Sequence, residues 1–329
     1  MHFIILGLAA VLLATLALRV VCVFPLQPVK TAPRSLSDQQ RSAALRMEAD
    51  VRAIASVPHN LDHVPALEAA ALYIEHELRA AGLLPKIQAF AVGKHTVRNI
   101  EVVFEPTAPA TAVSLVVGAH YDSAGDSPGA NDNGSGVAAL LEICRSFALE
   151  PPAVSRRVRL VFFVNEEYPH GKTDAMGALR HARALKESGE RVAGMIALET
   201  LGYFSDAPGS QRLPAPFNWI YPNRGNFVAF VALPGGGRFM RKALAHFRRA
   251  VVFPSTGTVV PSFVEGADLS DHWAYTNVGF PALMVTDTAP YRNPFYHQAH
   301  DLPHTVDYAN LARVVEGLTQ TLRTLTADA

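Results

Sequence analysis

Residues 114–148 read "SLVVGAHYDSAGDSPGANDNGSGVAALLEICRSFA" and predict a buried strand, a polar loop and a helix in that order. One carboxylate in the loop, Asp132, is surrounded by glycines: Gly129, Gly134 and Gly136. Glycine permits close approach of backbones and positive φ values, so the loop is expected to hold this carboxylate in one place. The alternative is a simple helix N-cap, a common role for an aspartate before a helix.

The same alternation of strand and helix continues along the chain. Apolar runs predict strands, and longer periodic runs predict helices, the first of which has Ser37 and Gln40 at capping-box spacing. The expected strands are 97–105, 112–120, 156–167, 191–200, 226–233 and 280–286, and the expected helices are 37–57, 65–82, 136–148, 174–188, 237–250 and 305–325. Such alternation predicts a single α/β domain with a mixed, mostly parallel sheet covered by helices on both faces.

Two stretches lack this regular pattern, 203–225 and 254–273. Irregular segments of this length in a compact domain are usually functional or disordered. The first contains several aromatic residues, which favour an ordered wall of a site over a mobile linker.

The composition excludes some partners. The chain has 329 residues, 49% of them hydrophobic and 18% charged, with a formal net charge of zero. This balance gives no electrostatic reason to expect nucleic acid as a partner. The two cysteines, Cys22 and Cys144, make a disulfide framework improbable, and Cys144 lies in an apolar run that predicts burial.

The N-terminus is apolar over residues 3–24, with Arg19 as the one charged residue, and this length is enough to cross a bilayer at about 20 residues per span. Residues 1–24 are therefore expected to form a hydrophobic helix that is a signal peptide or a membrane anchor, with 25–36 as a linker and 37–329 as the main domain. An anchor is favoured because no clear cleavage site follows. The positive-inside rule, applied to Lys30 and its neighbours, would place the main domain in the cytoplasm.

Polar residues lie at the ends of three of the expected strands. His120 and Asp122 lie at the end of 112–120, Glu166 and Glu167 at the end of 156–167, and Glu199 at the end of 191–200. Ligands of open α/β sheets bind beyond the carboxyl ends of the strands, so these side chains are expected to meet at one edge. Clustered carboxylates repel one another unless a cation compensates them. One histidine with several carboxylates and no thiolate suits zinc, with manganese or cobalt as substitutes.

The individual roles have alternatives. His120 is a ligand or an ordinary strand-end histidine, and the spacing to Asp122 favours a ligand that this carboxylate orients. Glu166 and Glu167 are expected to point to opposite sides of a strand end, so that one binds metal and the other acts as a general base. A second histidine must come from "YHQAHDLPHTVDY", where His297, His300 and His304 are candidates. Pro303 argues against a three-histidine helical face.

The combination "GAHYDS…PGANDNGSG", "NEE", a strand-end acid and "YH…D" resembles the zinc aminopeptidases of the bacterial leucyl aminopeptidase type. That family also includes glutamate carboxypeptidase, the glutaminyl cyclases and the catalytically silent transferrin-receptor domain. The resemblance covers roughly residues 95–310. It implies two zinc ions that share Asp132, with Glu166 as the general base and a peptide as the substrate. The remaining ligands it implies are His120 and Glu199 for one zinc, and Glu167 and His297 for the other.

The resemblance has further implications. It implies a cis peptide bond between Asp132 and Asn133, and a carbonyl-polarising role for Tyr296. Family members are frequently exported, so the resemblance favours a periplasmic or extracellular location, tethered or released. Asp271 and His272 lie in a segment that resembles one near the family's substrate pocket, and a structural hydrogen-bonded pair is the alternative there.

This chain departs from the family pattern at three positions. Glu199 stands where many members have Asp, Gln298 replaces a commoner Thr, and Leu302 replaces the Thr of a "DT" pair. Two other functions on the same fold stay open: a glutaminyl-cyclase-like acyltransferase with one zinc, and a non-catalytic interaction domain. The retained D-N-x-S-G run at Asp132 argues against the first, and competent side chains at every ligand position argue against the second.

Overall fold

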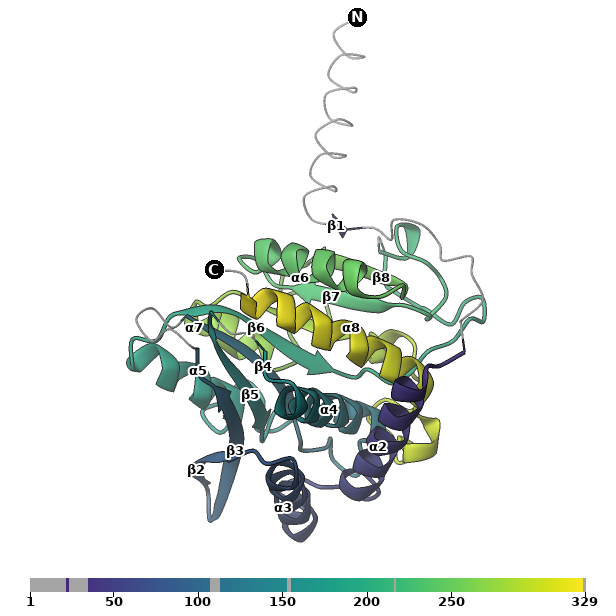
Figure 1. The fold of residues 1–329 in the computed structure, drawn as a ribbon. Coiled ribbons are helices and arrows are strands. Elements are labelled where there is room, and N and C mark those ends of the chain that lie inside the picture. Colours follow the sequence, from purple (N-terminus) through teal and green to yellow (C-terminus); the bar gives the residue numbers. More distant parts are fainter. Residues whose placement is uncertain (1–21, 24–34, 107–112, 153–154, 216, 328–329) are drawn as a thin grey trace, which may run out of the picture.

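The structure is a computed structural model that describes residues 22–23, 35–106, 113–152, 155–215 and 217–327. One nine-stranded sheet runs through the described part of the chain, in the order β1-β8-β7-β9-β6-β4-β5-β3-β2 (Figure 1). The strands are β1 (Cys22–Val23), β2 (Lys86–Val92), β3 (His95–Phe104), β4 (Ser114–His120), β5 (Arg157–Phe163), β6 (Val192–Glu199), β7 (Val228–Ala232), β8 (Ser255–Val259) and β9 (Ala282–Thr286).

The centre of the sheet is parallel, and its flanks are mixed. β9, β6, β4 and β5 run parallel to one another. β3 pairs antiparallel with β5 on one side, and β7 pairs antiparallel with β9 on the other. This mixed sheet with a parallel centre confirms the expected single α/β domain.

Helices cover both faces of the sheet. They are α2 (Asp38–Ile54), α3 (Val64–Ala80), α4 (Gly136–Leu149), α5 (Gly177–Glu187), α6 (Gly237–Ala250), α7 (His272–Val278) and α8 (Tyr308–Ala327). Side chains of α2, α3, α4, α6 and α8 share one hydrophobic core, whereas those of α5 and α7 belong to a second. In β4, Leu115 and Val117 enter the first core and Val116 enters the second, as the alternation of a strand requires.

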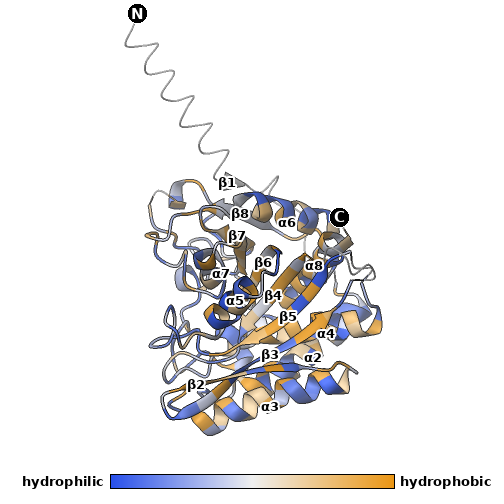
Figure 2. Ribbon diagram, turned by 90° about the vertical axis from the view of Figure 1, so that its left-hand side faces the viewer, coloured by the Kyte–Doolittle hydropathy of each residue, from blue (hydrophilic) through white to orange (hydrophobic). Residues whose placement is uncertain are grey.

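The distribution of hydropathy explains the layers. The central strands are largely hydrophobic in Figure 2, whereas outer helices such as α3 alternate hydrophobic and hydrophilic positions. A strand that is buried on both faces has no polar side to expose. Every residue of β4 and β7 is accordingly buried.

The structure contains the expected start of α2 and the expected buried cysteine. Ser37 caps α2, and the reciprocal bonds of a capping box join Ser37 and Gln40. Cys144 is fully buried. Among the described strands and α-helices, four were not expected from the sequence: the strands β1, β2 and β8 and the short helix α7.

The expected N-terminal hydrophobic helix lies almost wholly outside the described residues. Cys22 and Val23 form β1, which pairs antiparallel with Thr258 and Gly257 of β8. Within the ranges that the structure describes, no helix combines the length and the hydropathy needed to cross a bilayer.

Candidate metal centre

The carboxyl ends of the parallel strands carry the candidate site. His120 is the last residue of β4, and Glu199 is the last residue of β6. Glu166 and Glu167 follow β5, and Asp132 lies in the turn η2 (Ala130–Ser135) that precedes α4. Neighbouring parallel strands place their ends at the same edge, so the polar residues after them converge.

The side chains form two overlapping groups around Asp132. Nε2 of His120 lies 3.5 Å from Oδ1 of Asp132 and 3.4 Å from Oε2 of Glu199. Nε2 of His297 lies 3.0 Å from Oδ2 of Asp132 and 3.4 Å from Oε1 of Glu167. In each group the three potential ligand atoms lie within 4.8 Å of one another. Asp132 therefore offers one oxygen to each group, which is the geometry of a carboxylate shared by two cations.

The donor set fits a cation. Oε1 of Glu167 and Oε2 of Glu199 are buried and have no hydrogen-bond partner among the residues that the structure describes. Burial alone would lower the pKa values of both histidines, but the surrounding carboxylates outweigh it and raise them, that of His297 to about 10. The site thus attracts positive charge, as a cluster of carboxylates in a buried setting must. Nitrogen and oxygen donors without thiolate suit zinc.

Hydrogen bonds to the backbone of the loop after β4 hold Asp132 in place. Asp301 accepts hydrogen bonds from the backbone N–H groups of Asn131 and Asp132, each at 3.0 Å. Asn133 ties the same turn to β6, because its Nδ2 donates to the Leu198 carbonyl at 2.8 Å and its Oδ1 accepts from the Thr200 N–H at 3.0 Å. These bonds fix Asp132 relative to Glu199, the residue between Leu198 and Thr200.

The turn also meets the expectations for its glycines and its peptide bond. Gly129 has φ +72°. At Gly136 a Cβ atom would lie 2.3 Å from Oδ1 of Asn133 and 2.5 Å from the Leu198 oxygen, so only glycine fits there. The Asp132–Asn133 peptide bond is cis, as the family resemblance implied. The N-cap position of α4 is Ser135, and Asp132 is therefore not its cap.

Asp122 has a role that the spacing alone did not reveal. Its Oδ1 accepts from the Glu166 N–H at 3.1 Å, and its Oδ2 accepts from the Glu167 N–H at 3.2 Å. Its contact with His120 is mainly through the backbone, since Nδ1 of His120 lies 3.1 Å from the Asp122 carbonyl oxygen and 3.7 Å from Oδ1. Asp122 therefore anchors the two glutamates as well as the imidazole.

The expected opposite orientation of Glu166 and Glu167 on a strand end was wrong. β5 ends at Phe163, and Asn165 has φ +62°, which breaks the extended conformation before the glutamates. Both carboxylates consequently lie on the side of His120, and one potential ligand atom of each of the three residues lies within 4.8 Å of the others. Burial raises the pKa of Glu166, and the neighbouring Glu167 and Glu199 raise it further.

The other residues that the sequence analysis singled out differ in their position relative to the ligand groups. Tyr296 is partly buried and its ring stacks on the His297 ring, with centroids 3.9 Å apart. His300 and His304 are exposed and belong to neither of the described ligand groups. Asp271 and His272 are not a hydrogen-bonded pair. Both Asp271 oxygens are buried without a hydrogen-bond partner in the described part of the chain, and Nε2 of His272 lies 2.9 Å from the Ala267 oxygen.

Asp301, the aspartate of the "YH…D" motif, was assigned no role of its own in the sequence analysis. It is fully buried and holds the turn that carries Asp132. An aspartate shortly before Pro303 in an otherwise polar loop is a weak sequence signal. Its hydrogen-bond partner Asn131 lies 170 residues earlier in the chain, so no local pattern indicates the contact.

Comparison with known proteins places this arrangement in a class. Residues 99–322 match peptidase family M28, and the chain belongs to this family of hydrolases. An uncharacterized protein of Escherichia coli, YfbL, is 34% identical over 299 residues, which cover 88% of each chain. A probable leucine aminopeptidase of Arthroderma otae is 26% identical over 62% of this chain and 51% of its own, so the chain spans about half the length of that relative.

Solved structures share the fold at low sequence identity. BSAP, a zinc aminopeptidase from Bacillus subtilis, superimposes with a TM-score of 0.68 at 15% identity, covering 90% of this chain and 97% of its own. The glutaminyl cyclase of Tannerella forsythia superimposes with a TM-score of 0.60 at 20% identity, covering 89% and 100%. Both results show the zinc-aminopeptidase fold and leave the choice of reaction to the site itself.

Proposed function

We propose that this protein is a metal-dependent exopeptidase, an aminopeptidase that holds two zinc ions and removes N-terminal residues from peptides. The observation that carries the proposal is the pair of histidine–carboxylate groups that share Asp132. His120 and Glu199 would hold one ion, His297 and Glu167 the other, and Asp132 would bridge them. Membership of peptidase family M28 and the similarity to probable leucine aminopeptidases support it.

Bound zinc would supply Lewis acidity and lower the pKa of a coordinated water. Glu166 transfers the proton in this proposal. It lies beside the two histidine–carboxylate groups that share Asp132 and is a member of neither. Its carboxylate takes a proton from the attacking water and hands it to the departing amine. Tyr296, next to His297, donates a hydrogen bond from its hydroxyl to the substrate carbonyl.

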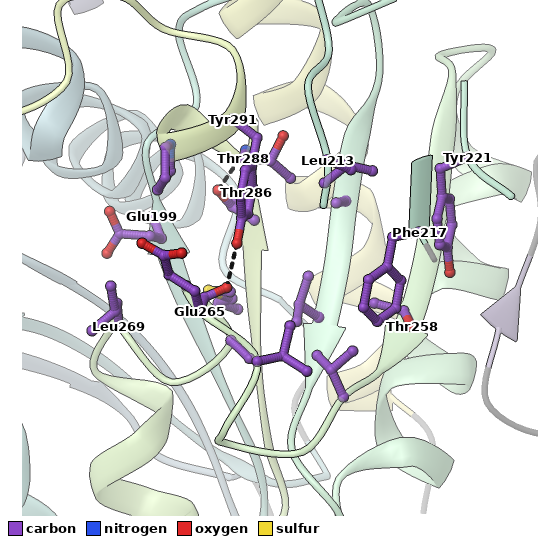
Figure 3. Close-up of a pocket in the computed structure, with 18 of the residues that line it drawn as sticks. Glu199, Leu213, Phe217, Tyr221, Thr258, Glu265, Leu269, Thr286, Thr288 and Tyr291 are labelled. Atoms are coloured by element: carbon purple, nitrogen blue, oxygen red, sulfur yellow. Dashed lines mark hydrogen bonds between the residues drawn. The ribbon is translucent and has the colours of Figure 1, made fainter. Parts of the chain in front are cut away.

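Recognition of an amino terminus fits the charge of an apolar pocket that opens beside Glu199 (Figure 3). Glu265 lines this pocket together with the proposed zinc ligand Glu199, and no lysine or arginine is found among the described residues that line it. A carboxypeptidase needs a cation to bind the terminal carboxylate, preferably an arginine fork. The carboxylate of Glu265, which is not among the proposed zinc ligands, instead suits the ammonium group of an N-terminal residue.

One experiment combines metal analysis with turnover of a small panel of aminoacyl-p-nitroanilides. We expect hydrolysis in the wild-type protein, and loss of nearly all of it in Glu166→Gln with zinc still near two per chain. An active, purified Glu166→Gln protein would refute the assignment of the base. Release of ammonia from N-terminal glutaminyl peptides without peptide cleavage would favour the cyclase alternative. That alternative is supported only by the similarity in fold to a glutaminyl cyclase.

Location and attachment form a separate proposal. We infer export of the catalytic domain, with residues 3–24 as a tether or a removed signal, from the apolar N-terminus. A reporter enzyme that is active on one side of the membrane, fused to the C-terminus, tests it. Reporter activity in the cytoplasm would contradict it, in line with the positive charges that follow the apolar segment.

A further inference from the structure

A basic helix lies beside the point where the apolar N-terminal segment ends. Val23 in β1 pairs with Gly257 of β8. α6 packs on one face of that strand, since a Cβ atom at Gly257 would lie 2.8 Å from side-chain atoms of Met240 and Leu244 in α6. β1, β8 and α6 accordingly lie together in Figure 1, at the end of the sheet opposite to β2. The end of the apolar segment and α6 therefore share one end of the domain.

The apolar side of α6 belongs to the protein core, and its other side is basic. The buried residues of this helix in the first core are Met240, Ala243, Leu244 and Phe247. The exposed residues, apart from two alanines, are Arg238, Arg241, Lys242 and Arg249. With 3.6 residues per turn these four side chains lie along one side of the helix, opposite the buried ones. We call them the basic stripe.

The basic stripe lies in a part of the chain that has no acidic residue. Between Asp206 and Glu265 the sequence contains seven arginines and lysines and no aspartate or glutamate. The neighbouring helix α8 has one acidic residue, Glu316, which accepts a hydrogen bond from Nε2 of Gln40 in α2 at 2.7 Å and so faces α2. A chain with a formal net charge of zero thus concentrates positive charge on this helix.

A bilayer surface fits this arrangement. Residues 3–24 are long enough to cross a bilayer at about 20 residues per span, and they end at β1 beside α6. Clusters of about four to eight lysines and arginines next to a membrane segment attract anionic lipids. Because the apolar side of α6 is buried in the core, the helix contacts headgroups through its charges and does not insert between acyl chains.

We propose that the basic stripe of α6 binds the anionic phospholipid headgroups of the bilayer that holds the N-terminal segment. This contact turns the β1 edge of the sheet toward the membrane and the β2 edge away from it. The inference goes beyond the proposed peptidase activity and does not depend on it, but it rests on the proposed attachment through residues 3–24.

Quenching by labelled headgroups tests the orientation. The full-length protein is reconstituted in nanodiscs of phosphatidylcholine, or of an equal mixture of phosphatidylcholine and phosphatidylglycerol, each with a lipid that carries a spin label on its headgroup. A thiol-reactive fluorophore is attached at Ala245→Cys, an exposed position of α6, or at Leu72→Cys on α3 as the control, which is 53% exposed near β2. Cys22→Ser is included in both proteins, and Cys144 is fully buried, so only the introduced thiol reacts.

In the anionic discs we expect the α6 fluorophore to be quenched several-fold more than the α3 fluorophore. The excess should be smaller in neutral discs and should fall as salt is raised from about 0.1 M to 1 M, where the Debye length shrinks from about 10 Å to about 3 Å. Equal quenching at the two positions in anionic discs, an equal excess in neutral discs, or no association with anionic discs would overturn the inference.

Charge-neutralised variants provide the second arm. Replacement of the four residues of the basic stripe by glutamine should abolish the excess quenching at α6. The matched control removes four positive charges near the β2 edge and should keep the excess; its glutamine substitutions are at Arg79, Lys86, Lys94 and Arg183. Denaturant unfolding shows that both variants are folded, so the result does not depend on peptidase activity.

An unchanged excess in the variant of the basic stripe would contradict the assignment, as would an equal loss in both variants. Nucleic acid is the other polyanion that a basic helix binds. Binding of double-stranded DNA that needs the basic stripe, without excess quenching in anionic discs, would also overturn the inference.

Discussion

The carboxylate of Asp122 bridges the backbone of the two glutamates, with Oδ1 3.1 Å from the Glu166 nitrogen and Oδ2 3.2 Å from the Glu167 nitrogen. The same residue contacts Nδ1 of His120 through its carbonyl oxygen. The buried side chain of Asp122 therefore positions the proposed base and one proposed metal ligand, Glu167, while its backbone carbonyl orients a second, His120. Residues that orient metal ligands in this way typically affect metal affinity or activity by about 10–100-fold.

Replacement of Asp122 by asparagine should lower kcat/KM by about 10–100-fold, because one oxygen acceptor becomes an NH₂ donor that faces an N–H group. Steady-state kinetics and zinc titration measure the effect. Asp126→Asn is the matched control, since Asp126 is exposed in the same loop and has only a 3.9 Å contact with His63. Activity within twofold of wild type in Asp122→Asn would show that the bridge is not needed.

Gly136→Ala should weaken zinc binding and lower the free energy of unfolding by about 1–3 kcal/mol. The added methyl group would overlap Oδ1 of Asn133 and the Leu198 carbonyl oxygen, the two atoms that join the turn of Asp132 to β6. Chemical denaturation and zinc titration of the purified variant test both effects. A variant with unchanged stability and zinc affinity would mean that this close contact is not required.

Acid should destabilise the protein partly through Glu190. Burial alone would raise the pKa of Glu190, but hydrogen bonds from Arg159 and Ser114 outweigh it and lower the pKa to about 2. A folded-state pKa below the usual value of 4.5 contributes stability that is present above about pH 4.5 and is lost as the pH falls toward 2. Glu190→Gln should therefore unfold with a weaker pH dependence across that interval, measured by denaturant titration at each pH.

A Glu190→Gln protein that loses stability between pH 4.5 and 2 as steeply as wild type would contradict this assignment. The carboxylates of the metal centre also titrate, so zinc-loaded and zinc-free samples are compared. The difference in stability between Glu190→Gln and wild type should be the same in zinc-loaded and zinc-free samples. The ion pair of Glu190 with Arg159 joins strand β5 to the segment before β6 and includes no candidate metal ligand.

The sequence predicted the elements that have strong local signals. Continuous apolar runs predicted β4, β5 and β6, and the Ser37–Gln40 spacing predicted the start of α2. Convergence of the polar residues followed from topology, because parallel strands end at one edge. The candidate residues at the strand ends, His120, Glu167 and Glu199, could therefore be named from the pattern, whereas the choice of His297 among three histidines came from the family resemblance.

Features that depend on distant partners were not predictable. β8 is a short run of Ser, Thr, Gly and Val that is stabilised as a strand by its pairing with β7. The left-handed Asn165 redirects the glutamates, and a single residue's positive φ leaves little trace in the sequence. The apolar pocket likewise arises from the small side chains of three separate strands beneath two loops, a combination that no local pattern reports.

Zinc stoichiometry of the purified, active protein decides whether Asp132 is shared by two ions. We expect two zinc ions per chain, loss of activity on chelation, and its return as the second equivalent is restored. Asp132→Ala should retain neither ion tightly, because Asp132 lies in both ligand groups. Full peptidase activity in metal-free protein, or two tightly bound zinc ions in Asp132→Ala, would contradict these expectations.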